Sequence, residues 1–336
     1  MKLVTPTRIL FAGLGLLSVV LALLVIPANE YIFLPDRAHP VAPLVTVQGG
    51  HDPKHGGVYF VDVVFQNATL LDKLTGGALH NGADLYPKQA VDPPGVTSQL
   101  RKQLDQQDMH LSQQVAAAVA LRAAGKKVVV RPVGVRVTYV WQGMPAFEKL
   151  QPGDVIVAVD GKPALTGTQL RSDIRAHRIG DVVAVAVRRG KETLVEKLKT
   201  VGAGKGKNRI PVVGIATEQA LDIHLPLRVS INAGNVGGPS AGVAFALGVM
   251  EELGLDVVHG HRIAATGEIF ADGSIGPIGG IKQKTIGARE AHVDAFLVPA
   301  GDNAKEARKY AHGLRIIAVD TFPQALRALA TLGGNG

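Results

Sequence analysis

The chain has 336 residues, of which 46% are hydrophobic and 19% charged, so it can bury a core and is long enough for more than one domain. It contains no cysteine, which excludes disulfides, thiolate metal sites and cysteine nucleophiles. The formal net charge is +8, yet no dense Lys/Arg block and no aromatic stacking motif accompanies it. We therefore expect no nucleic-acid partner.

An uncharged apolar run begins the chain. It extends from Ile9 to Ile26 and follows the basic residues Lys2 and Arg8. A run of about 18 residues is just long enough to cross a bilayer, and the basic flank favours a cytoplasmic N-terminus. We therefore expect residues 1–27 to form a cytoplasmic tip and a single transmembrane anchor in the cell membrane, with the rest of the chain extracytoplasmic. A signal peptide cleaved after Ala28 is the alternative.

The next segment, 28–57, carries several Pro residues and a Gly-Gly pair, which predicts a stalk and a connecting loop. His51 and His55 within it invite interpretation as metal ligands. Pro53 lies between them and opposes the single helical face that such ligands would share, so we expect no metal site.

Strands and helices are predicted from the spacing of apolar residues. β-branched and aromatic residues fill Val58 to Phe65, which is typical of a strand, and apolar residues recur at helical spacing over 96–124. Short strands and turns follow over 127–201, and a Gly-Lys linker leads to a final part, 209–332, in which strands and helices alternate.

The Gly-Gly-Pro-Ser-Ala-Gly segment that contains Ser240 is the strongest candidate for chemistry. Pro239 suits the first position of a helix, so Ser240 should lie at the N-terminus of the apolar helix that follows. The unpaired N–H groups and positive dipole of that end could hold an oxyanion. Gly238 and Ala241 leave room for a substrate backbone. A serine that serves only as an N-cap is the alternative.

A serine nucleophile needs a base, and Lys284 is the candidate. A helix that starts near Ile281 places Lys284 on the same face as Ile281 and Ala288, which should point inward. Burial lowers the pKa of an amine toward that of a working base. Thr266 could orient the pair with its hydroxyl. A lysine that snorkels to solvent is one alternative, and a Ser-His-Asp triad drawn from the eleven histidines is another.

Three motifs together resemble the proteolytic domain of Lon proteases: the segment around Ser240, Thr266-Gly-Glu-Ile, and the Ile-Gly-Gly-Ile-Lys-Gln-Lys segment that ends at Lys284. The resemblance implies that Ser240 is the nucleophile, Lys284 the base and Thr266 its support. Gly237 departs from the family, because many Lon proteins have an acid three residues before the serine. No P-loop motif occurs, so we expect no nucleotide and no other cofactor.

Residues 127–201 resemble the PDZ domains of bacterial proteases, through Pro145-Ala146 and the Leu-Gln-Pro-Gly-Asp-Val-Ile segment that begins at Leu150. The resemblance implies a carboxylate-binding loop, an edge strand that continues to Val140, and a short helix, which together bind an extended peptide. The implied pocket residues are Val133, Gly134, Val135, Val137, Leu170 and Ile174. A PDZ fold that only packs against the protease is the alternative.

The whole pattern resembles the PDZ-containing, membrane-anchored Lon-like serine proteases of bacteria. It implies an α+β fold in which 58–124 and 209–332 form one Lon-like domain and 127–201 is an inserted, mainly β PDZ-like domain. The implied activity is that of a serine endopeptidase, which hydrolyses unfolded or specific extracytoplasmic polypeptides without ATP. The PDZ-like domain would guide or regulate substrate access. A homo-oligomer such as a hexamer is implied. A peptide-binding membrane scaffold with an inactive Lon-like domain is the alternative.

Overall fold

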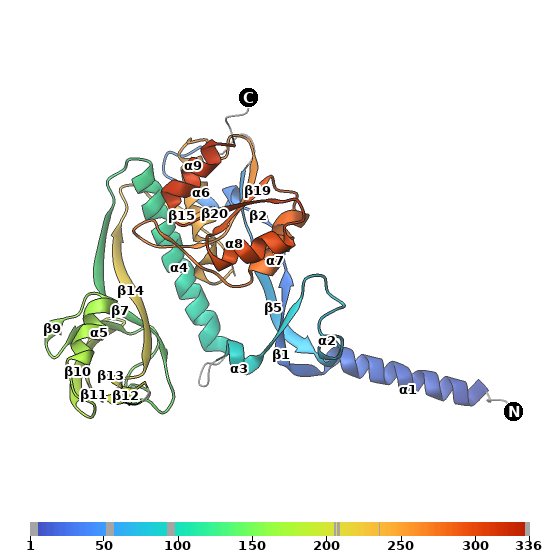
Figure 1. Ribbon diagram of the computed structural model, residues 1–336, viewed down its shortest axis with the longest axis horizontal. Helices are drawn as coiled ribbons and strands as arrows, with labels where there is room; N and C mark the ends of the chain where they lie inside the picture. The colour runs from blue at the N-terminus through green and yellow to red at the C-terminus, as the bar shows by residue number, and fades with distance from the viewer. Residues whose placement is uncertain are drawn as a thin grey trace.

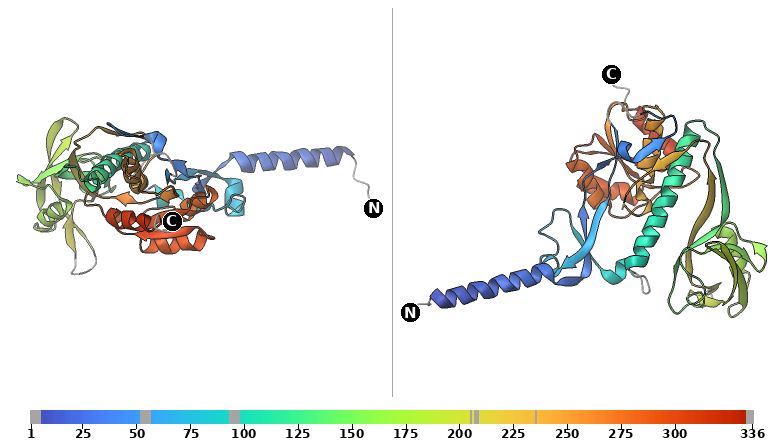
Figure 2. Two further views of the ribbon diagram at one scale, coloured as in Figure 1. Left: turned by 90° about the horizontal axis from the view of Figure 1, so that it is seen from above. Right: turned by 180° about the vertical axis from the view of Figure 1, so that it is seen from behind.

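The computed structural model describes residues 6–51, 57–92, 98–204, 206, 209–234 and 236–332. The chain is a mixed α/β protein. Figure 1 shows three parts: a larger lobe that contains the C-terminal third, a smaller lobe of strands, and the helix α1 (Pro6–Val25), which projects away from both. The two further views in Figure 2 show the same arrangement.

The transmembrane anchor expected for residues 1–27 finds no support. Among the residues that the structure describes, no helix combines the length and the apolar character that crossing a membrane requires.

The larger lobe is built on a five-stranded sheet with the order β2-β4-β16-β19-β20. Four of the strands run parallel, whereas the short β2 pairs antiparallel with β4. Parallel strands are usually covered on both faces, which suits their almost wholly apolar sequences. The strands are β2 (His39–Pro40), β4 (Gly57–Phe60), β16 (Arg262–Ala265), β19 (Ala295–Pro299) and β20 (Arg315–Val319).

Alternate residues of these strands face two separate cores, as the period of two in a strand requires. Ile263, Ala265 and Leu297 join the core that includes α4, α6 and α9. Ala264 and Phe296 face the opposite core, which includes α7 and α8. The helices are α4 (Ser98–Ala123), α6 (Gly242–Glu252), α7 (Ile281–Glu290), α8 (Asp302–Tyr310) and α9 (Phe322–Ala330).

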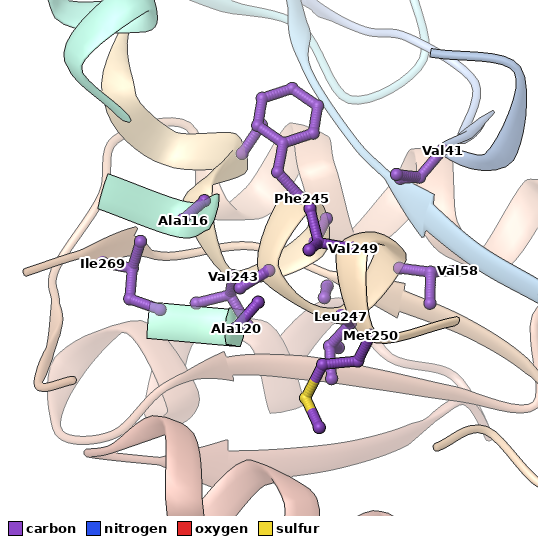
Figure 3. Packing of buried hydrophobic residues seen from close by; sticks show 14 of the residues in the cluster. Val41, Val58, Ala116, Ala120, Val243, Phe245, Leu247, Val249, Met250 and Ile269 are labelled. Atoms are coloured by element: carbon purple, nitrogen blue, oxygen red, sulfur yellow. The ribbon is translucent and has the colours of Figure 1, made fainter. Parts of the chain in front are cut away.

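Helix α6 is the centre of the first core, because each of its residues is buried. Figure 3 shows its Phe245 and Val249 among side chains from α4 and β4. A Cβ at Gly248 would lie 2.4 Å from Val41 Cγ1, so only glycine lets the segment that contains Val41 pack this closely against α6. The apolar helix expected after Ser240 is therefore present, and it is preceded by one 3-10 turn, η3 (Pro239–Ala241).

The run Val58 to Phe65, expected as one strand, is two strands. β4 ends at Phe60, and β5 (Val63–Thr69) leaves the central sheet and pairs with β1 (Pro27–Pro35). With β6 (Asp84–Pro87) they form a three-stranded sheet of order β5-β1-β6, so β5 lies at an edge. The break places the charged Asp62 at the crossover rather than inside an apolar sheet.

The segment 28–57 was expected as a stalk and a loop, but its described residues, 28–51 and 57, are part of the folded lobe. It holds most of β1, then β2, η1 (Ala42–Leu44) and β3 (Val45–Val47), which pairs with β15 (Val229–Ile231). The physical reason is that its apolar residues are buried: Ile32 and Val41 are each 0% exposed.

Short elements connect these sheets. They are α2 (Leu70–Thr75), α3 (Lys88–Val91), β17 (Glu268–Ile269) and β18 (Ile275–Gly276). β17 and β18 form a two-stranded hairpin next to α6.

The smaller lobe is an antiparallel sheet with the order β11-β10-β8-β7-β14, with α5 packed against it. Its core contains Val135, Val137, Leu170, Ile174 and neighbouring strand residues. The elements are β7 (Val129–Val140), β8 (Val155–Val159), β9 (Lys162–Pro163), α5 (Gly167–Arg175), β10 (Val182–Arg189), β11 (Glu192–Lys199), β12 (Val201–Ala203), β13 (Ile210–Val212) and β14 (Ile215–His224).

The two lobes are joined by α4 and by the long ribbon of β7 and β14, which run beside one another in Figures 1 and 2. Arg136 of β7 holds this junction together. Its guanidinium donates to Asp108 Oδ1 of α4 at 2.9 Å and, from Nε, to Glu218 Oε1 of β14 at 2.5 Å. The side chain of one strand of the smaller lobe thus reaches the helix that packs on α6.

Candidate active site

Ser240 lies in the 3-10 turn that leads into α6. Gly238 before it has φ +80°, a conformation that favours glycine, and no atom lies within 4 Å of where its Cβ would be. The carbonyl of Ser240 is held by two donors, Gly267 N–H at 2.8 Å and Thr266 Oγ1 at 3.1 Å. The residues Thr266 and Gly267 therefore fix the turn at the carbonyl of Ser240, and the space next to the Cα of Gly238 is free of other atoms.

Lys284 reaches Ser240 from α7, one turn after the helix begins. Its Nζ donates to Ser240 Oγ at 2.6 Å and lies 3.3 Å from Thr266 Oγ1. Lys284 is 4% exposed and Thr266 0% exposed. Burial lowers the pKa of Lys284 to about 8, although the carboxylate of Asp62 acts in the opposite direction. A buried amine that releases its proton near neutral pH and touches a hydroxyl can accept the proton of that hydroxyl.

Lys284 was expected on the inward face of α7, and it is buried there. Ile281 and Ala288 are buried on either side of Lys284. Lys282 lies two residues earlier on α7, and its Nζ donates to Asp84 Oδ1 at 2.7 Å rather than to Ser240. The period of the helix thus separates the two lysines.

Helix α4 supports the serine turn from the other side. Ser112 Oγ donates to the carbonyl of Pro239 at 3.0 Å, and the carbonyl of Asp105 accepts the N–H of Gly238 at 2.9 Å. A Cβ at Gly237 would lie 2.8 Å from Asp105 Cβ. The glycine at the position where many Lon proteins have an acid is thus explained, because α4 leaves no room for a side chain there.

A cavity of about 930 Å³ opens in front of Ser240 and Lys284. Phe33 and Phe65 of the three-stranded sheet line it, together with Arg101 and Asp105 of α4. The Arg101 guanidinium lies 4.9 Å from the ring centroid of Phe65 and forms an ion pair with Asp92. Burial raises the pKa of Asp105. The cavity therefore combines an aromatic wall with a charged one.

Sequence analysis missed Asp62, which lines the same cavity as Ser240 and Lys284. The signal was present, because Asp62 is the single charged residue in the apolar run from Val58 to Phe65. Asp105 and Arg101 were also missed. They lie among the many polar residues of α4, and nothing in the helical spacing distinguishes them.

The histidine alternatives do not meet Ser240. Among the described residues that line the cavity, none is a histidine. His224 pairs with Asp222 at 2.9 Å on the surface, and the nearest acid to His261 is Asp294, 3.6 Å away. His55, weighed as a metal ligand, lies outside the described residues.

The expected PDZ pocket differs from the observed lobe. β7 is not an edge strand, because β14 pairs with it along its whole length. The pairing was missed because β14 follows β7 only after six other strands. A Cβ at Gly134 would meet the carbonyl of Ile156 at 2.5 Å, so this glycine permits a close strand approach. Val135, Val137, Leu170 and Ile174 are core residues, and Val133 lines a surface cavity beside α4.

Two domain families match the chain. Residues 191–331 match the Lon protease (S16) C-terminal proteolytic domain, and residues 102–200 match the PDZ domain. The Lon protease of Clostridium beijerinckii is 35% identical over 134 residues, which is 38% of this chain and 16% of that protein. The Lon protease of Helicobacter pylori is 29% identical over 184 residues, which is 52% of this chain and 21% of that protein.

Solved structures of PDZ domains are also similar to part of the chain. The PDZ domain of the SdrC-like protein from Listeria monocytogenes is 26% identical and covers 25% of this chain and 87% of that chain, with a TM-score of 0.24. The chain spans about a fifth of the length of its curated relatives or less. The matches place a Lon-type C-terminal proteolytic domain and a PDZ domain within this chain.

Proposed function

We propose that the protein is a serine endopeptidase in which Ser240 is the nucleophile and Lys284 the general base. The observation that carries the proposal is the 2.6 Å contact between Ser240 Oγ and the buried Nζ of Lys284, whose pKa is lowered to about 8. Burial and an adjacent hydroxyl are what a lysine base requires. Thr266 supports the pair, because its hydroxyl lies 3.3 Å from Nζ and also donates to the Ser240 carbonyl.

The reaction begins when neutral Lys284 takes the proton of Ser240 and Ser240 Oγ attacks the substrate carbonyl carbon. The oxyanion that forms is stabilised by N–H groups of the first turn, at Ser240 and Ala241, because the first N–H groups of a helix have no partner within it. The ammonium of Lys284 then protonates the leaving amine. Water, activated by the same lysine, releases the acyl group.

Substrates reach the site as extended, flexible segments. The cavity in front of Ser240 adjoins β5, whose outer edge is unpaired in the described sheet. A peptide can add to such an edge with main-chain hydrogen bonds. The sequence holds no P-loop motif, so we propose that cleavage proceeds without ATP on unfolded or locally frayed polypeptides.

Ser240→Ala tests the proposal. We expect the rate of casein hydrolysis to fall roughly 10³-fold or more, while the circular dichroism spectrum stays unchanged. A fluorophosphonate probe should label the wild-type protein and Ser230→Ala, an exposed control serine, but not Ser240→Ala. If Ser240→Ala retains full activity, the proposal is wrong. Peptide binding without labelling of the wild-type protein would favour an inactive scaffold.

The PDZ domain, we propose, binds a peptide along β14, which is the edge strand of its sheet and contacts α5. The preceding turn contains Gly214, whose φ is +84°. Hydrogen exchange in the presence of a C-terminal peptide checks this. Protection should appear in β14 and not in β11, the opposite edge. Protection at neither edge would favour a domain that only packs against the protease.

Two further expectations remain proposals. A membrane location with the protease and PDZ domains extracytoplasmic is tested by protease accessibility of a C-terminal epitope in spheroplasts. A homo-oligomer, such as a hexamer, is tested by sedimentation of the purified protein. Protection of the epitope, or a monomer at working concentration, would contradict the respective proposal.

A further inference from the structure

Asp62 occupies a special place in the fold. It lies at the crossover between β4 and β5, where the chain passes from the central sheet to the three-stranded sheet. It lines the cavity that holds Ser240 and Lys284, and 25% of its side chain is exposed. A partly buried charge at the end of an apolar strand lowers the stability of the fold unless other groups compensate it. The neighbours of Asp62 therefore indicate how its charge is accommodated.

Two of these neighbours form a cluster with Asp62. His39 Nε2 lies 3.5 Å from Asp62 Oδ1 and 3.2 Å from Asp36 Oδ2. The His39 ring also stacks on Phe60, with 5.1 Å between the ring centroids, and Phe60 is buried. The imidazole is therefore held in place and links the two carboxylates.

The cluster is packed directly onto the helix that carries the lysine. A Cβ at Gly287 of α7 would lie 1.8 Å from the carbonyl oxygen of Asp36. Gly287 is three residues after Lys284, so it lies on a neighbouring part of the same helix face. The distance from the Asp36–His39 segment to α7 is thus set by backbone contact, not by flexible side chains.

The charges around Asp62 come from three directions. Asp36 and His39 face it from the β1–β2 segment, and Lys284 faces it from α7; Arg101 and Asp105 lie across the cavity on α4. Burial and Asp36 raise the pKa of Asp62, whereas His39 and Lys284 act to lower it. Asp62 in turn acts to raise the pKa of Lys284.

We propose that Asp62 is a positioning residue for the Ser240–Lys284 pair: its carboxylate stabilises the ammonium form of Lys284, and His39 and Asp36 hold that carboxylate against α7. The inference rests on the proposed function. During attack, the O–H bond of Ser240 breaks, its proton bonds to the amine lone pair of Lys284, and Oγ bonds to the carbonyl carbon. The positive charge that appears on Nζ then lies in the field of the Asp62 carboxylate. The proton leaves Lys284 when the C–N bond breaks, so Asp62 is unchanged over the cycle.

Asp62→Asn separates this role from a structural one. Removing the negative charge lowers the pKa of Lys284, so the acid limb of the pH profile of kcat/KM should shift to lower pH. The plateau rate at alkaline pH should fall roughly tenfold, because the ammonium loses its stabilisation. Asp62→Glu should return the acid limb toward the wild-type position.

The matched control is Asp84→Asn, which removes the same charge from the partner of Lys282 on the same helix. We expect its acid limb to coincide with that of the wild-type protein. If Asp62→Asn lowers the rate but leaves the acid limb in place, Asp62 is only structural and the inference is wrong. If Asp62→Asn and Asp84→Asn shift the acid limb equally, the shift comes from the change in the protein's net charge, and this result also overturns the inference.

The pH dependence of fluorophosphonate labelling distinguishes this failure from failure of the proposed function. A wild-type protein that neither cleaves nor labels refutes the Ser240–Lys284 proposal itself. A wild-type protein that labels on Ser240, with a pH profile identical in Asp62→Asn, refutes only the role of Asp62.

Discussion

Replacing Lys284 by methionine should stabilise the folded protein at neutral pH. Methionine has a similar length and carries no charge, so it can fill the same buried position. Burial lowers the pKa of Lys284 from 10.5 to about 8 in the folded protein. This difference corresponds to about 3 kcal/mol between the two protonation states. Because Lys284 is buried, little of that cost is relieved by solvent.

The sign follows from proton binding. Below pH 8 the lysine is protonated in both the folded and the unfolded chain, and the folded chain bears the cost of a buried ammonium. Between pH 8 and 10.5 the unfolded chain binds more protons, so the free energy of unfolding of the wild-type protein rises with pH. We therefore expect Lys284→Met to exceed the wild type by up to about 3 kcal/mol at pH 7 and to lose this advantage as the pH approaches 10.5.

Urea unfolding at pH 7 and at pH 10, followed by circular dichroism, measures the difference. Lys282→Met is the control, because Lys282 keeps a carboxylate partner and should gain no stability when it is replaced. A Lys284→Met protein that is less stable than the wild type at pH 7, by an amount that does not change with pH, would refute the assignment of a buried, costly ammonium.

Three further changes test the structure. Gly287→Ala forces its Cβ against the Asp36 carbonyl and should cost about 1–3 kcal/mol in urea unfolding, whereas Gly279→Ala, with no atom within 4 Å of its Cβ, should cost little. Phe245→Ala empties the centre of the larger core and should cost about 3–5 kcal/mol, seen in the same assay. Arg136→Ala leaves Asp108 and Glu218 without their cation; burial already raises the pKa of both carboxyls, so the loss of stability should be greater at pH 8 than at pH 5.

Local patterns in the sequence were sufficient for parts of the site that lie within single elements. The period of α7 distinguishes Lys284 from Lys282, and Pro239 indicates where the 3-10 turn with Ser240 begins, just before α6. These predictions need only the geometry of one helix and its capping preferences. The contact between Ser240 and Lys284, 44 residues apart, came instead from the resemblance of the three motifs to one family.

Contacts between distant strands could not be predicted in the same way. The pairing of β7 with β14 places the edge of the PDZ sheet at β14, and no local pattern predicts which later strand takes that position. The apolar run from Val58 to Phe65 had the composition of one strand. Composition does not reveal that the chain changes sheets at Asp62. That change depends on two distant strands: β16 pairs with the first half of the run, β4, and β1 pairs with the second half, β5.

The requirements on Lys284 conflict, and the structure divides them among different neighbours. A base must be neutral before the attack, and burial provides this by lowering the pKa of the amine to about 8. The same burial would penalise the ammonium that the attack creates, so a nearby carboxylate is needed at that moment. A fully ionised carboxylate in direct contact would raise the pKa of the lysine again and keep it protonated. Asp62 lines the same cavity as Lys284 and acts to raise the pKa of the amine, yet burial outweighs this effect and leaves that pKa at about 8, so both needs are met. On this reasoning the Asp36–His39–Asp62 cluster adjusts a balance between two protonation states, and variants of it should change the pH range of activity before they abolish activity.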